Sequence, residues 1–154
     1  MMKLHESTDR IERKVLLRAP RSRVWRALTD AGEFGAWFQA RLNGVFTPGA
    51  LVQGNVAIPD YEHLKIEMTI ERMDPESLFS FRWHPYPSDP AADYSSEPTT
   101  LVEFHLEEVE GGTQLTVIES GFDRIPAARR AEAFRMNDEG WAGQLANIAR
   151  YVEG

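Results

Sequence analysis

Alternation of apolar and polar residues predicts β-strands in several parts of the chain. It is clearest over residues 64–70, where Leu64, Ile66, Met68 and Ile70 alternate with charged or hydroxyl-bearing residues. A period of two is typical of a strand that buries one face. The same pattern predicts strands over residues 11–19, 78–83, 101–109 and 113–120, and residues 51–58 are compatible with a further strand.

Short turn sequences join neighbouring predicted strands. Asp74-Pro75-Glu76 follows one strand directly, and Gly111-Gly112 separates the last two. Consecutive strands joined in this way form an antiparallel sheet. The segment between Trp83 and Thr99 holds four prolines among polar residues, so we expect an exposed, mobile loop over residues 85–98.

Helical spacing appears in two places. Val24, Trp25 and Leu28 indicate a short helix after the first strand, and a second short helix follows from Thr29-Asp30 to residue 38. The longest apolar stripe predicts a helix over residues 127–152, beginning after Pro126; its members are Phe134, Trp141, Leu145, Ile148 and Val152.

This order of elements predicts an α+β fold in one domain spanning residues 1–154. About six or seven strands should form a curved antiparallel sheet around the long C-terminal helix, because the exposed apolar face of the sheet needs a cover. A hollow remains wherever side chains of the two layers fail to meet. Residues 1–9 are expected to be a flexible N-terminus.

Composition and charge limit the classes of partner that we expect for the protein. The net charge of −7 works against nucleic acid and anionic membranes, and no apolar run is long enough for membrane insertion. The chain has no cysteine and no apolar stretch near its first residues of the kind a secretory signal carries, so we expect a cytoplasmic protein.

Several short stretches in this order resemble one known family. They are residues 19–30 (APRSRVWRALTD), Trp37-Phe38, residues 119–122 (ESGF), and Gly140-Trp141 followed by Leu145. The sequence is similar to the START-like or SRPBCC superfamily, and within it to bacterial homologues of the heat-shock protein 90 ATPase activator. The resemblance implies a helix-grip fold with an internal cavity that often binds a small apolar molecule. The superfamily holds carriers, sensors, cyclases and cochaperone domains, so it does not imply a single activity.

Inward strand parity, the helix stripe and the end of the second short helix predict the residues that line such a cavity. An apolar, largely aromatic lining with few polar groups is typical of a small-molecule site. The predicted ligand-binding residues are Trp37, Phe38, Phe81, Trp83, Phe104, Val117, Glu119, Trp141 and Leu145.

Glu119 and His84 are the two weak candidates for catalysis. Glu119 shares strand parity with Leu115 and Val117 and should point inward, where a carboxylate needs a cation or a hydroxyl, or else a wet cavity mouth; turning into solvent at the strand end is the alternative. His84 could reach the cavity mouth, although a solvated loop position is favoured. No histidines lie at metal-ligand spacing, and we expect neither a metal nor another cofactor.

Three functions remain open from the sequence. The preferred hypothesis is a binding module that encloses a small apolar or amphipathic ligand, as a carrier or a sensor. The second is a cyclase or hydrolase acting on an aromatic or polyketide-like ligand. The third is a chaperone regulator or stress-response interaction module. The missing counterpart of the activator's N-terminal chaperone-binding domain weighs against a chaperone partner, and a homodimer stays open.

Overall fold

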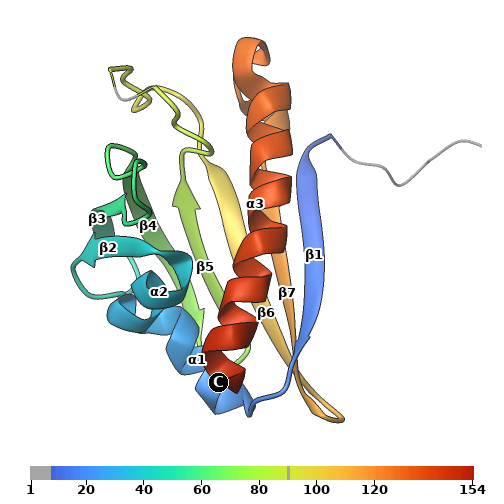
Figure 1. Ribbon diagram of the computed structural model, residues 1–154. Helices are drawn as coiled ribbons and strands as arrows, with labels where there is room; N and C mark the ends of the chain where they lie inside the picture. The colour runs from blue at the N-terminus through green and yellow to red at the C-terminus, as the bar shows by residue number, and fades with distance from the viewer. Residues whose placement is uncertain (1–7, 90) are drawn as a thin grey trace, which may run out of the picture.

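One curved sheet of seven antiparallel strands carries the fold, and a long helix lies along its inner face (Figure 1). The computed structural model describes residues 8–89 and 91–154. The strands are ordered β1-β7-β6-β5-β4-β3-β2 across the sheet. They comprise β1 (Arg10–Leu17), β2 (Ala40–Asn43), β3 (Leu51–Val56), β4 (Lys65–Asp74), β5 (Leu78–Trp83), β6 (Thr100–Val109) and β7 (Gly112–Ser120).

The helices follow the predicted order. Two short helices, α1 (Arg21–Thr29) and α2 (Ala31–Phe38), come directly after β1. A 3₁₀ turn, η1 (Phe122–Arg124), precedes α3 (Ala127–Glu153), which begins after Pro126 as expected. The predicted α+β class, with a curved sheet around a C-terminal helix, is therefore confirmed.

One of the strands, β2, was not anticipated from the alternation of apolar and polar residues. It has only four residues, too few to establish a period of two, and it pairs only with β3 at the edge of the sheet. The other strand predictions agree with the structure, although β1 ends at Leu17 and β3 at Val56, two residues before the predicted ends.

Strand parity fixes which side chains face α3. In β4 the even-numbered residues Ile66, Met68 and Ile70 are buried, and in β7 every second residue from Thr113 to Glu119 is buried. The turn between β6 and β7 needs glycine because Gly111 has a φ of 89° and a Cβ on Gly112 would stand 2.0 Å from the carbonyl oxygen of Leu17. The glycines of this turn therefore help to fix the pairing register of β6 and β7, and that register turns Glu119 inward.

Aromatic rings fill most of the space between the sheet and the helices. Phe34 lies at the centre, with ring centroids 4.7 Å from Trp37 and 5.0 Å from Phe38. Phe104 stacks 6.2 Å from Phe79 on the neighbouring strand. Rings of this size interdigitate closely, so the middle of the inner face is packed core.

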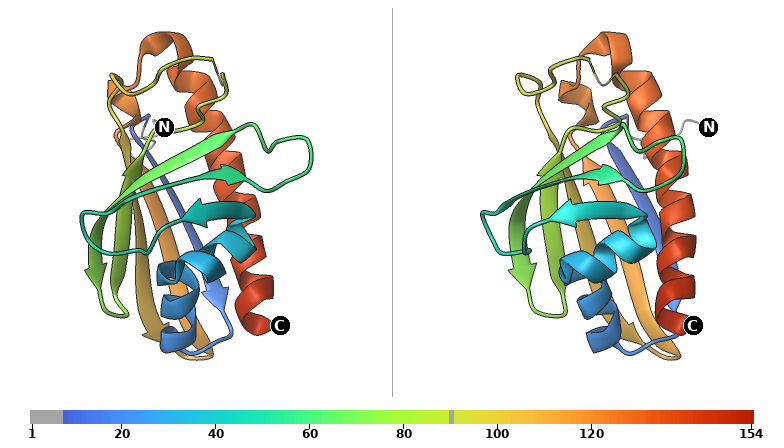
Figure 2. Two further views of the ribbon diagram at one scale, coloured as in Figure 1. Left: turned by 90° about the vertical axis from the view of Figure 1, so that its left-hand side faces the viewer. Right: turned by 60° about the vertical axis from the view of Figure 1, so that its left-hand side comes forward.

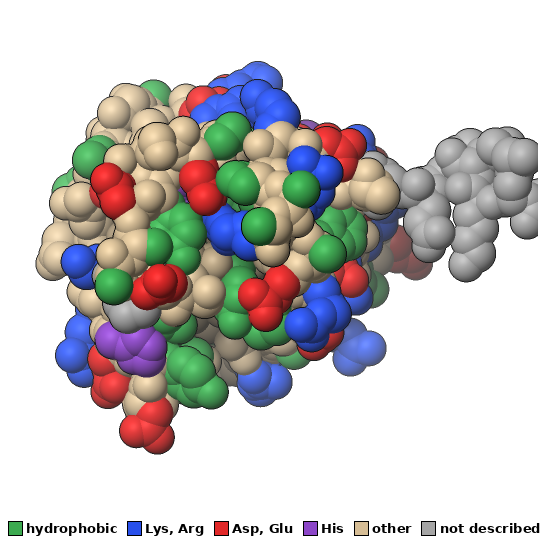
Figure 3. All heavy atoms as spheres, turned by 90° about the horizontal axis from the view of Figure 1, so that it is seen from above, with side chains coloured by type: hydrophobic (Ala, Val, Ile, Leu, Met, Phe, Trp, Pro, Cys, Tyr) green, Lys and Arg blue, Asp and Glu red, His purple; other side chains and the backbone are tan. Residues whose placement is uncertain are grey.

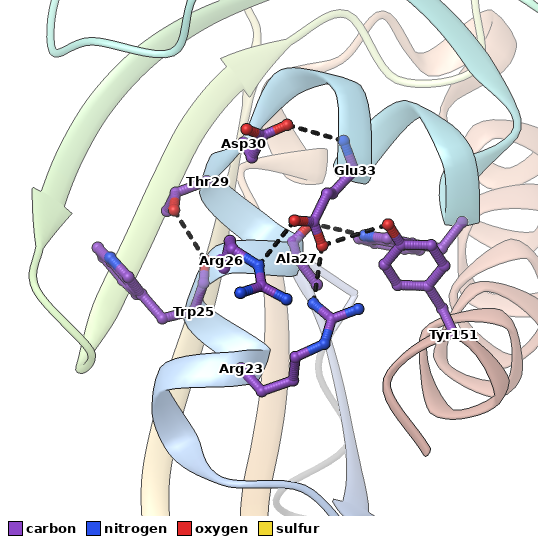
Figure 4. A network of polar contacts seen from close by, with 9 residues as sticks. Arg23, Trp25, Arg26, Ala27, Thr29, Asp30, Glu33 and Tyr151 are labelled. Atoms are coloured by element: carbon purple, nitrogen blue, oxygen red, sulfur yellow. Dashed lines mark hydrogen bonds and ion pairs between the residues drawn. The ribbon is translucent and has the colours of Figure 1, made fainter. Parts of the chain in front are cut away.

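A charged cluster joins the three helices at the opposite end from the loop after β5 (Figure 4). Glu33 accepts hydrogen bonds from Arg23 at 2.7 Å, from Arg26 at 2.8 Å and from the hydroxyl of Tyr151 at 3.2 Å. Asp30 caps α2 by accepting from the backbone N–H of Glu33. Since Tyr151 belongs to α3, the cluster fixes the C-terminal end of that helix to α1 and α2.

The structure describes the predicted flexible N-terminus only in part. Residues 1–7 of the predicted flexible N-terminus lie outside the described residues, whereas Asp9 accepts hydrogen bonds from the backbone N–H groups of Gly121 and Phe122 at 3.1 Å each. Among the described residues, none of the helices combines the length and the hydropathy needed to cross a membrane.

We predict that Glu33→Gln lowers the free energy of unfolding by about 1 kcal/mol at pH 7, because a partly exposed, charge-assisted cluster loses its anion. Burial opposes ionisation of Glu33, but the hydrogen bond to Arg23 and the charges of Arg23 and Arg26 outweigh it and lower the pKa of the carboxyl. The stabilisation is therefore present above the ordinary value of 4.5 and disappears as the pH falls through the lowered pKa.

Urea unfolding at a series of pH values measures this effect. The difference between Glu33→Gln and the unmodified protein should narrow in acid. Glu107→Gln, at an exposed position of β6, is the matched control and should change little. A difference that is independent of pH would contradict the assignment.

Candidate functional site

A cavity of about 370 Å³ opens at one end of the sheet. At this end the loop after β5 crosses towards α3 (Figure 2). Its walls come from the end of β3, the start of β4 with the residue before it, the end of β5, the loop after β5, the end of α2 and one side chain of α3. Four aromatic rings, those of Phe38, Trp83, Tyr86 and Tyr94, contribute to the lining. The other lining residues are Val56, Leu64, Lys65, Ile66, Glu67, His84, Pro87, Ser88, Asp93, Ser95 and Asn137.

A smaller cavity of about 110 Å³ adjoins the larger one along α3. The two share Phe38, Trp83 and Asn137, so these three side chains form the partition between them. The smaller cavity is completed by Met136, Gly140, Trp141 and Gln144. A change at the partition would alter both spaces.

The loop of residues 85–98 forms the outer wall of the larger cavity and is tied to the beginning of α3. Arg129 forms an ion pair with Glu97 at 2.8 Å and donates hydrogen bonds to the backbone carbonyls of Pro85 and Tyr86 at 2.9 and 3.1 Å. Its guanidinium also lies 4.7 Å from the ring centroid of Tyr94. As predicted, the described residues of this loop form no helix or strand, and Pro90 lies outside them.

The surface at this end is mixed in character. Seen from above, hydrophobic side chains lie among acidic and basic groups, with no single sign of charge dominating (Figure 3). The exposed charged residues around the cavity likewise include Lys65, Glu67 and Asp93. Among the described residues, charges of both signs therefore lie around the cavity.

Glu119 lies behind the partition and is completely buried. One carboxylate oxygen accepts from the indole N–H of Trp83 at 2.8 Å and from the Thr100 hydroxyl at 2.6 Å, and the other accepts from the indole N–H of Trp141 at 2.8 Å. The side-chain amide of Asn137 donates to both oxygens, at 3.0 and 3.1 Å. The carboxylate thus joins three strands to α3.

These contacts settle the alternatives for Glu119 that strand parity left open. Its side chain points inward, does not reach solvent at the strand end, and obtains neutral donors that include a hydroxyl. Arg82, next to Trp83 on β5, pairs with Glu71 at 2.7 Å. Burial raises the pKa of the Glu119 carboxyl, and the hydrogen bonds from Thr100, Trp83, Trp141 and Asn137 oppose that rise without cancelling it.

The structure divides the predicted ligand-binding residues into groups. Phe38 and Trp83 line both cavities, and Trp141 lines the smaller one. Glu119 supports these side chains from behind. The remaining five lie in the packed core and line neither cavity: Trp37, Phe81, Phe104, Val117 and Leu145.

The physical reason for this division is the size of the aromatic side chains. Phe104 is fully buried, with its ring centroid 5.6 Å from that of Trp141, and Phe81 lies 5.2 Å from Trp83. The rings therefore close the middle of the inner face. Both cavities lie near the end of the sheet, where the loop after β5 meets α3.

His84, the second weak candidate for catalysis, lines the larger cavity and is half-buried. Its Nε2 lies 3.2 Å from the backbone carbonyl of Glu97, to which it donates. The described residues contain no group of three or more His, Asp or Glu side chains arranged to hold a metal ion.

Two functional side chains were missed from the sequence. Asn137 lies four residues before Trp141, and that helical spacing places both on one face of α3; its polarity set it apart from the apolar stripe. Arg129 carries no such signal, because its role depends on the conformation of a loop that is distant in the chain.

We predict that Glu119→Gln lowers the free energy of unfolding by about 1–3 kcal/mol, because an amide NH₂ would then face an indole N–H that can only donate. Since burial raises the pKa of Glu119, the folded protein holds this proton more tightly than the unfolded chain. The contribution of Glu119 to stability therefore falls as the pH rises above 4.5 towards the raised pKa. The glutamine side chain of the variant does not titrate, so its contribution to stability does not change with pH.

Thermal or urea unfolding from acid to neutral pH checks this sign. The destabilisation caused by Glu119→Gln should be largest in acid and shrink as the pH rises, the reverse of the trend expected for Glu33→Gln. Glu107→Gln is again the exposed control. A cost that grows with pH would mean that the donors, not burial, dominate the titration of Glu119.

Solved structures of bacterial proteins share this architecture. The protein MLL2253 from Mesorhizobium loti is 21% identical, with a TM-score of 0.73 over 94% of this chain and 96% of that one. The Aha1 dimer from Colwellia psychrerythraea is 16% identical, with a TM-score of 0.69 over 94% of this chain and 96% of that one. At these identities the likeness shows the fold alone.

DynU16, described as a putative protein in the dynemicin biosynthetic locus, is 26% identical, with a TM-score of 0.71 over 94% of this chain. The chain spans about half the length of DynU16, 47% of it. Among curated proteins, none matches the sequence significantly. The model of the family described as "Activator of Hsp90 ATPase homolog 1-like protein" matches residues 18–153. Because that match covers most of the chain, the protein belongs to the family of Activator of Hsp90 ATPase homolog 1-like proteins.

Proposed function

We propose that the protein binds a small, mainly apolar molecule in the larger cavity, as a carrier or a sensor. The observation that carries the proposal is the lining: four aromatic rings and several aliphatic side chains enclose about 370 Å³, with few polar groups away from the rim. Small-molecule sites typically have about 300–1,000 Å³ and this mixture of lining residues. The ligand would lie between Trp83 and the loop of residues 85–98.

The enzyme alternative has less support from the geometry. Glu119 lines neither cavity, and both of its oxygens accept hydrogen bonds from protein groups, so it has no free route to a substrate proton. His84 is engaged with the Glu97 carbonyl at the cavity wall. A general base must reach the proton it removes, and neither group is placed to do so.

The chaperone-regulator alternative rests on the family description, and a homodimer rests on the likeness to the Colwellia protein, whose title describes a dimer. The geometry of the cavity supports neither of these two alternatives. The ligand-binding proposal therefore stands first.

Binding is tested with N-phenyl-1-naphthylamine, an apolar dye whose fluorescence rises on leaving water. We predict that Val56→Trp, which places a large ring in the cavity wall, weakens dye binding at least about tenfold, because an overfilled site excludes the probe. Leu51→Trp is the control, since Leu51 lies on the same strand and is 56% exposed. Equal binding by all three proteins would refute the proposal.

We also propose that the loop of residues 85–98 is the route by which the ligand enters, with Arg129 as its attachment to α3. Arg129→Ala removes the ion pair to Glu97 and two hydrogen bonds to the loop backbone. We predict faster amide hydrogen exchange in the loop and faster association of N-phenyl-1-naphthylamine, because local opening costs less without these contacts.

Arg135→Ala is the matched control, since Arg135 lies on the same helix and is exposed, with Glu139 one turn away. It should leave loop exchange and dye association unchanged. Loop amides of Arg129→Ala that exchange as slowly as those of the unmodified protein would rule out Arg129 as the attachment.

A further inference from the structure

The amide of Asn137 has a fixed orientation. Its Nδ2 donates to both oxygens of Glu119, which are held in turn by Trp83, Thr100 and Trp141. A carboxylate oxygen only accepts, so turning the amide oxygen towards Glu119 would set two acceptors against each other. The carbonyl oxygen Oδ1 of Asn137 is therefore directed away from Glu119.

This carbonyl is placed to meet a ligand. Asn137 lines both cavities and is the only residue of α3 among the described residues that line the larger one. No described residue donates a hydrogen bond to its Oδ1. A half-buried acceptor without a protein partner, beside the rings of Phe38 and Trp83, has its full capacity left for a bound molecule.

The other polar groups of the larger cavity are less suited to selecting a ligand. Lys65, Glu67, Ser88, Asp93 and Ser95 are all exposed at the rim, where water competes for them. The indole N–H of Trp83 is already used by Glu119, and His84 by the Glu97 carbonyl. Asn137 thus offers a half-buried acceptor beside the rings of Phe38 and Trp83.

We propose that Asn137 determines specificity, and that the protein prefers aromatic or other apolar ligands that carry a hydroxyl or N–H group able to donate to the Asn137 carbonyl. The inference rests on the proposed function and names its ligand class. A site built around a hydrogen bond discriminates against an analogue that lacks the donor, because the protein acceptor is then left unpaired in an apolar enclosure.

The experiment compares two probes with the same ring system, 2-naphthol and its methyl ether 2-methoxynaphthalene, by isothermal titration calorimetry at pH 7. Only the first can donate a hydrogen bond. The unmodified protein should bind 2-naphthol about 3- to 10-fold more tightly, the value of one hydrogen bond. Asn137→Leu, similar in size but apolar, should bring the two dissociation constants together.

Thr100→Val provides the control for the buried network. Thr100 also donates to Glu119, but it is completely buried and lines neither cavity, so its replacement removes a Glu119 partner without removing the Asn137 carbonyl. This variant should retain the preference for 2-naphthol.

The outcomes separate the two proposals. Equal affinity of the unmodified protein for the two probes would overturn the role of Asn137 and leave cavity binding intact. Loss of the preference in Thr100→Val as well as in Asn137→Leu would assign it to the network as a whole and overturn it too. Failure of both probes to bind would overturn the proposed function, and this inference with it.

Discussion

A carboxylate enclosed by aromatic rings has to be surrounded by hydrogen-bond donors, and this requirement organises the end of the fold that holds the cavities. Glu119 obtains donors from β5 through Trp83, from β6 through Thr100, and from α3 through Asn137 and Trp141. The sheet and the helix must therefore meet at a set distance and rotation. A small error in either would leave an indole N–H or a carboxylate oxygen unpaired, at a cost of about 1–3 kcal/mol each.

The contact between Glu119 and α3 also determines where the cavities lie. Below it, large rings fill the inner face, and beyond it α3 extends past the sheet to hold the loop of residues 85–98 through Arg129. The two carboxyl groups that attach α3 have pKa values shifted in opposite directions. Burial raises the pKa of Glu119, while nearby guanidinium groups lower the pKa of Glu33 at the far end of the helix. The fold thus combines a neutral-donor anchor near the cavity with an ion-pair anchor away from it.

The sequence pattern predicted the architecture well because period and parity act locally. Inward parity placed Glu119 correctly, since the side-chain alternation of a strand is fixed by its backbone. It could not distinguish a ring that packs from a ring that lines a void, so Phe81 and Phe104 were grouped with Phe38 and Trp83 although they lie in the core. That distinction depends on how rings from β5, β6 and two helices share one volume. The partners of Glu119 and the loop contacts of Arg129 likewise arise between segments far apart in the chain.

The tryptophans around Glu119 give the protein an optical property of its own. Of its four tryptophans, Trp83 and Trp141 stack with ring centroids 5.8 Å apart, and both donate their indole N–H to the same carboxylate. Both also border a cavity. Emission from an indole responds to the polarity and the hydrogen bonding around it, so a molecule entering beside Trp83 would change the intrinsic fluorescence without any added label. The pair that holds the helix against the sheet is thereby also a reporter of occupancy, readable in the unmodified protein.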